Sequence, residues 1–151
     1  MAATAWAFYH TTKRNLGRGA SGYQLSTDLF NLALFKTAAT NPADNKALSV
    51  KSQISNECSG GAYTAGGKTL SANTWTATAT STWKFDADDW VITATGTAIS
   101  AVLFAAIYKS VSAGGGPLLC YSQLSTAAFD VTTGNTLTIQ MNTAGIFTLA
   151  G

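Results

Sequence analysis

The chain has 151 residues with nine Lys or Arg, seven Asp or Glu and one His, which gives a net charge of +2 near neutral pH. Charged residues are only 11% and hydrophobic residues 46%, a composition that excludes a disordered chain and predicts one domain with its own core. The small net charge does not indicate a nucleic-acid partner, and the longest apolar run, residues 101–108, is shorter than the roughly 20 residues that cross a bilayer.

Residues 1–25 differ from the rest because they are basic and glycine-spaced, with no acidic residue before Asp28. Aromatic and arginine side chains commonly anchor protein interfaces. We therefore predict an extended N-terminal arm at residues 1–25 that lies on a neighbouring chain, followed by a sandwich domain at residues 26–151. The alternative is that the arm folds back on its own domain. The candidate partner-binding residues of the arm are Trp6, Phe8, Tyr9, Lys13, Arg14 and Arg18.

The chain contains two cysteines, Cys58 and Cys120. Its first residues lack the charged and apolar regions of a secretory signal, so reduced thiols are the expectation. We predict that the two cysteines are free rather than paired.

The first strand is expected at residues 30–36, where Phe30, Leu32 and Leu34 share one face. Residues 41–45 contain Asn, Pro and Asp and predict a turn. Residues 48–54 fit a strand or a loop equally well.

The glycine-rich loop at residues 60–69 resembles a phosphate-binding loop but has the wrong spacing. A P-loop requires a glycine five residues before Gly67, and that position is Ala62. A P-loop also opens a helix, whereas a threonine-rich strand follows here. We predict that Lys68 and Thr69 bind no nucleotide and that the glycines allow a sharp turn.

Residues 74–85 alternate cleanly between a hydroxyl face and an apolar face, as a half-buried β-strand does. Twelve residues are long for one strand, so a break near Ser81 into two paired strands is an equal expectation. Trp75 and Trp83 are expected to face the core. The apolar side carries Trp75, Ala77, Ala79, Ser81, Trp83 and Phe85.

An acidic turn at residues 86–89 leads into a strand at 90–95, and further strands are expected at 118–124, 129–131, 136–141 and 146–149. Residues 100–108 are apolar on both faces, which predicts a central strand covered on both sides, the second by a loop or another subunit. The regular spacing of short strands and turns predicts an all-β jelly-roll-like β-sandwich, with an immunoglobulin-like β-sandwich as the alternative.

The chain offers no recognisable catalytic group. His10 is the only histidine, so no second imidazole is available to complete a histidine-based zinc site. The carboxylates of Asp86, Asp88 and Asp89 are too few for a calcium site without further ligands, and a solvated turn is the preferred interpretation. We predict no enzymatic activity, no cofactor and no metal.

Several phrases in their order and spacing resemble a family of small virion structural proteins of tailed bacteriophages. The resemblance extends from about residue 29 to 149 and does not include the basic segment. It implies a β-sandwich in the mature particle, without enzymatic activity or cofactor. The phrases lie at residues 30–35, 63–70, 85–89, 134–140 and 145–149.

Two functions are compatible with this resemblance. The first is a capsid decoration (cement) protein that clamps neighbouring subunits of the head shell, bound to the major capsid protein and expected as a homo-oligomer such as a trimer. The second is a neck, tail or fibre component that binds host glycans through exposed aromatic residues. Both imply a virion protein that is assembled in the host cytoplasm, without nucleic acid or membrane as partner. The tryptophans that could stack on sugars are Trp6, Trp75, Trp83 and Trp90.

Overall fold

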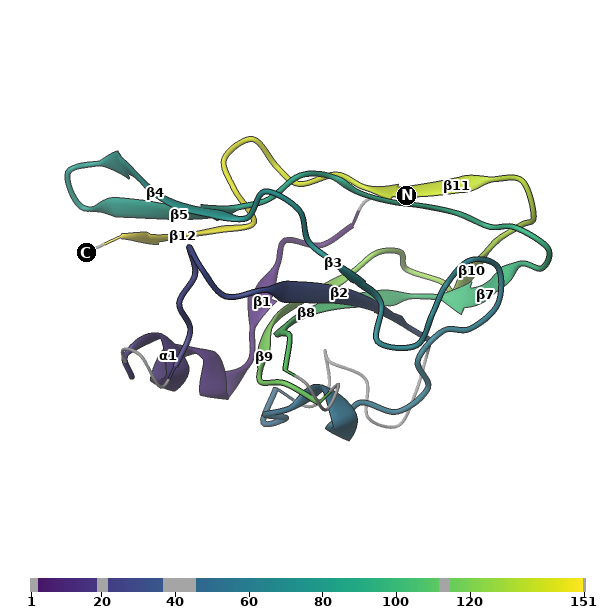
Figure 1. Ribbon diagram of the computed structural model, residues 1–151, viewed down its shortest axis with the longest axis horizontal. Coiled ribbons are helices and arrows are strands. Elements are labelled where there is room, and N and C mark those ends of the chain that lie inside the picture. Colours follow the sequence, from purple (N-terminus) through teal and green to yellow (C-terminus); the bar gives the residue numbers. More distant parts are fainter. Residues whose placement is uncertain (1–2, 19–21, 37–45, 112–114, 151) are drawn as a thin grey trace.

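The computed structural model describes residues 3–18, 22–36, 46–111 and 115–150. Within these ranges the chain forms two layers of antiparallel strands with one short α-helix, α1 (His10–Leu16) (Figure 1). The expectation of an all-β sandwich is confirmed. No helix in these ranges is long and apolar enough to cross a membrane.

The lower layer in Figure 1 is a sheet in the order β1-β9-β8-β2-β3. Two further strands extend this layer: β7 leads into β8, and β10 follows β9 and pairs with β7. The bounds of its strands are Ala7–Phe8 (β1), Phe30–Phe35 (β2), Lys68–Thr69 (β3), Ile99–Val102 (β7), Phe104–Lys109 (β8), Leu118–Gln123 (β9) and Phe129–Val131 (β10).

The upper layer consists of the sheet β12-β5-β4 and the pair β11-β6. Since β6 follows β5 and β12 follows β11, two long antiparallel paths form most of this layer. The turn between β4 and β5 falls at residues 80–81, so the expected break near Ser81 is confirmed. The strand bounds are Thr74–Ala79 (β4), Thr82–Asp86 (β5), Trp90–Thr93 (β6), Thr136–Ile139 (β11) and Phe147–Ala150 (β12).

The main core lies between the layers and includes Phe30, Leu32 and Leu34, as the alternation of residues 30–36 predicts. A second cluster covers the outer face of β2 and β8, where Tyr9, Leu48 and Ile54 of the same chain shield the sheet. The central strands are therefore buried on both faces, and the cover comes from the N-terminal segment and a loop.

One expected strand needs correction, and for residues 48–54 the loop is the correct one of the two alternatives. Residues 100–108 form two strands rather than one, because the chain is irregular at Leu103 and Ala101 has a φ of +57°. The amide of Ala101 donates to the side chain of Asp130 at 2.7 Å, which holds this irregular backbone in place. Residues 48–54 contain a short 3-10 helix at Lys51–Gln53 and no strand. The turn expected at residues 41–45 lies outside the described residues.

The N-terminal segment is part of the domain, so the extended arm is wrong for its described residues. β1 pairs with β9, and the side chains of Tyr9 and Thr12 are buried. The Thr12 hydroxyl donates to the carbonyl of Leu119 at 2.5 Å. Tyr23 and Leu25 also belong to the main core. Of the aromatic residues that suggested an interface, Tyr9 is buried, and Trp6 and Phe8 are half-buried against this chain's own core.

The burial expected for Trp83 is wrong, although its side of the strand is the expected one. Trp83 shares a face of β5 with Phe85, as alternation requires, yet Phe85 is fully buried and Trp83 is 44% exposed. Figure 1 shows why: the β4–β5 hairpin reaches past the end of β2, so the lower layer no longer covers it. Alternation gave the correct face but could not give the extent of the opposite sheet.

Candidate functional site

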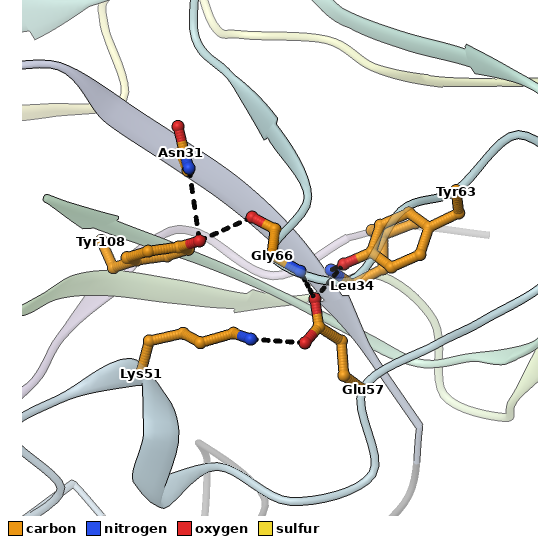
Figure 2. Close-up of polar contacts among 7 residues, drawn as sticks. All are labelled: Asn31, Leu34, Lys51, Glu57, Tyr63, Gly66 and Tyr108. Atoms are coloured by element: carbon orange, nitrogen blue, oxygen red, sulfur yellow. Dashed lines mark hydrogen bonds and ion pairs between the residues drawn. The ribbon is translucent and has the colours of Figure 1, made fainter. Parts of the chain in front are cut away.

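A connected group of polar contacts lies around Glu57, beside β2 (Figure 2). One carboxylate oxygen, Oε1, accepts hydrogen bonds from the Tyr63 hydroxyl and the Gly66 amide, both at 2.6 Å. The other oxygen, Oε2, pairs with the Lys51 ammonium at 2.5 Å. Both oxygens are thus occupied by groups of the same chain, and the carboxylate serves to fix the loop rather than to bind a substrate.

The same loop supplies hydrogen-bond partners to the backbone at the outer edge of β2. The Tyr63 hydroxyl accepts from the Leu34 amide at 2.9 Å, and the Cys58 amide donates to the Leu34 carbonyl at 2.9 Å. The Tyr108 hydroxyl donates to the Gly66 carbonyl at 2.6 Å. Burial raises the pKa of Tyr63 far above its usual value, so this hydroxyl stays protonated and can donate to Glu57.

The glycines of the loop are required by its path over β2. Gly67 has a φ of +71°, and a Cβ at this position would lie 1.9 Å from the Leu32 carbonyl oxygen. The next residues, Lys68 and Thr69, form β3 on the edge of β2. The loop therefore leads into a strand, which is not the context of a phosphate-binding loop, and the absence of nucleotide binding stays a prediction.

Both cysteines are buried in the main core and unpaired, as predicted. Burial raises the pKa of the Cys58 thiol to about 12, and burial raises that of Cys120 well above its usual value. The thiolate is the reactive form of cysteine. At neutral pH both side chains therefore act as small apolar core residues.

The acidic turn after β5 is tied to the rest of the upper layer. Asp86 pairs with the Lys84 ammonium at 2.8 Å, and Asp89 accepts a hydrogen bond from the Met141 amide at 2.8 Å. No cluster of three or more potential metal ligands occurs among the residues described. These two carboxylates hold the turn and the connection between β11 and β12.

The six predicted partner-binding residues do not form one surface. Tyr9 is buried beside Tyr121, and Phe8 is half-buried with its ring 4.7 Å from that of Phe147. The basic side chains lie elsewhere: Lys13 and Arg14 are exposed in the last turn of α1, with the exposed Arg18 just beyond it.

Trp6 lines a groove that sequence reasoning did not find. This groove of about 740 Å³ lies between residues 3–6 and β11, on the open side of the sandwich. No sequence signal marks it, because it results from two segments more than 130 positions apart. Its other lining residues are Ser122, Leu124, Phe129, Leu137, Thr138, Ile139, Gln140 and Asn142.

A second surface is the uncovered end of the β4–β5 hairpin. The rings of Trp75 and Trp83 stack with their centroids 5.8 Å apart, and Trp75 in turn touches the core at Phe147. Ala77 and Ala79, on the same side, are exposed. By contrast, Trp90 is only 3% exposed and cannot stack on a sugar.

No family model, curated protein or solved structure matches this chain.

Proposed function

We propose that this chain is a structural protein of a tailed-bacteriophage particle, a decoration protein that stabilises the head shell by clamping neighbouring subunits. The proposal rests on the phrases at residues 30–35, 63–70, 85–89, 134–140 and 145–149, which resemble small phage virion proteins. The observation that carries the docking part is the stacked and uncovered pair of Trp75 and Trp83.

The uncovered hairpin has the chemistry of a protein-docking surface. Tryptophan is among the residues that contribute most to binding when a partner covers it. Trp83 is 44% exposed, and its contact with Trp75 holds the ring in place before binding, which reduces the entropy lost on docking. Trp75 is anchored in turn by the core, so the surface is rigid.

The edge of the hairpin also favours a protein partner. β4 is the edge strand of its sheet, and its residues include no charged side chain and no proline. Soluble proteins usually protect exposed edges with charges, prolines or bulges, because free backbone groups attract another strand. This edge has one irregularity of register, near its end at Ala77 and Ala79, and is otherwise regular. A neighbour in a shell would shield it.

Reconstitution tests the proposal. Phage heads that lack this protein would be mixed with the purified chain, separated by sedimentation and assayed for bound copies and for resistance to heating. We expect saturable attachment and more stable heads. Trp83→Ser should prevent attachment while the chain remains folded, and Thr138→Ser on the opposite edge should attach as the wild type does. Heads that bind no protein, or bind it without becoming more stable, would contradict the decoration role.

The copy number separates this role from a neck, tail or fibre role. A decoration protein repeats with the symmetry of the shell, and the clamp would be a homo-oligomer, with a trimer as the expected form, in contact with the major capsid protein. A neck or tail component would occur in a few copies at one vertex.

A further inference from the structure

We propose that the groove between residues 3–6 and β11 binds a neutral saccharide. This role goes beyond the docking proposed above, because it concerns a different surface and a different class of ligand. The groove has about 740 Å³ of space, which falls within the range of about 300–1,000 Å³ typical of small-ligand sites.

One wall of the groove is fixed in place. The Thr4 amide donates to the Gln123 carbonyl at 2.8 Å, and the Gln123 amide donates to the Thr4 hydroxyl at 3.0 Å. The Ser122 hydroxyl donates to the Thr4 carbonyl at 2.7 Å. Farther along, the contact between Phe8 and Phe147 joins β1 to β12, so the two edges of the sandwich meet on one side of the groove. The site is therefore largely preformed.

The opposite wall is the free edge of the upper layer. β11 pairs with β6 on one side only, and its outer edge has no strand partner in the described ranges. The floor is apolar: Trp6, Phe129 and Leu137 belong to the interior side but are only half-buried. On the same interior side near the centre of the sheet, Ile107 is fully buried. The sandwich thus stays open here and exposes an aromatic platform.

The polar groups at the rim are neutral and available. No Lys, Arg, Asp or Glu lines the groove. The side chains of Thr138 and Gln140 have no hydrogen-bond partner among the described residues, and both are exposed. Asn142 uses its carbonyl oxygen to accept from the Ala144 amide at 2.8 Å, which leaves its amide hydrogens free.

This combination selects for sugar chemistry. A pyranose ring has an apolar C–H face that stacks on an aromatic ring, while its hydroxyls exchange hydrogen bonds with amides and hydroxyls at the rim. A nucleotide or an acidic sugar would bring a charge into a groove that offers no opposite charge, at a cost in desolvation. An extended peptide could pair with the edge of β11, but it would leave the side-chain amides of Gln140 and Asn142 without a defined role.

Titration of the full chain with a panel of sugars tests this inference. The panel would contain neutral oligosaccharides of glucose, galactose, mannose and N-acetylglucosamine, with the corresponding uronic acids for comparison, and binding would be followed by saturation-transfer NMR and tryptophan fluorescence. We expect saturable binding of at least one neutral oligosaccharide and none of its acidic counterpart. Trp6→Ala should abolish binding, Trp6→Phe should retain part of it, and Gln140→Ala should weaken it about five- to tenfold, as expected for the loss of one hydrogen bond.

Trp83→Ser is the matched control, because it removes a tryptophan that lies outside the groove. It should leave sugar binding unchanged, and Trp6→Ala should leave attachment to phage heads unchanged, so the two proposals fail independently. The inference is overturned if no neutral sugar of the panel binds, or if Trp6→Ala binds sugar as well as the wild type does.

Discussion

Replacement of Tyr63 by phenylalanine removes a single oxygen atom and tests the structural role assigned to the Glu57 group. The Tyr63 hydroxyl is the acceptor for the Leu34 amide and a donor to Glu57 (Figure 2). Leu34 is fully buried, so water cannot readily replace the lost acceptor. The hydroxyl is thus the link between the buried strand β2 and the loop that covers its edge.

The cost has two parts. A buried amide left without an acceptor costs about 1–3 kcal/mol, and a hydrogen bond to a charged group is worth about 1.5–3 kcal/mol. Glu57 keeps its bonds to Gly66 and Lys51, and its side chain is 15% exposed, so water can compensate for part of the second loss. We therefore expect Tyr63→Phe to lower the free energy of unfolding by about 2–4 kcal/mol.

Urea denaturation of wild type and variant measures this loss, with an unchanged dependence on urea as the sign that both unfold in the same way. Tyr121→Phe is the control, because the Tyr121 side chain is also buried while its hydroxyl has no hydrogen-bond partner in the described ranges. It should change stability by less than about 0.5 kcal/mol. If the two variants lose the same small amount, the Glu57 group does not hold the loop.

Three further predictions concern other parts of the fold. Deletion of residues 1–18 should cost at least about 3 kcal/mol or prevent folding, because it removes the buried Tyr9 and β1; a truncated chain with an unchanged melting temperature would restore the idea of a separate arm. Gly67→Ala should lower the melting temperature markedly, because the new Cβ would clash with the Leu32 carbonyl. Gly134→Ala is the control: a Cβ there meets nothing within 4 Å, so the variant should cost only the strain of its positive φ. Equal losses in the two variants would contradict the close approach of the loop. The thiol of Cys58 has a pKa of about 12 in the folded state but ionises near 9.0 when unfolded. Its contribution to the free energy of unfolding is therefore fully present below pH 9, and it declines by about 1.4 kcal/mol per pH unit as the pH rises from 9 towards 12. Cys58→Ala should flatten that decline in urea melts at pH 8 to 11, and a parallel decline in both proteins would refute the assignment.

Much of the fold could be predicted from local pattern. The alternation of residues 74–85 gave the two faces, and their length made a paired hairpin as strong an expectation as one long strand. The apolar run at 100–108 gave a strand buried on both sides. These features depend on side chains close together in the chain, which is where periodicity is informative. The run is divided at Leu103 into β7 and β8, and Ala101 within β7 has a positive φ, which a non-glycine residue does not signal in advance.

The candidate sites could not be predicted in the same way. Phe8 and Tyr9 have the composition of an interface, and only the pairing of β1 with β9 places them against this chain's own core. The exposure of Trp83 depends on where the opposite sheet ends. The groove depends on the approach of residues 3–6 to β11, which no short-range pattern encodes. Function at such surfaces follows from tertiary arrangement rather than from motif.

The most direct test of the decoration role is a three-dimensional map of the phage particle that contains this protein. The proposal predicts density for the sandwich on the outside of the head, repeated with the symmetry of the shell, with the β4–β5 hairpin and Trp83 against a neighbouring subunit. Density confined to the neck or the tail, or a Trp83 that faces solvent in the assembled particle, would contradict it.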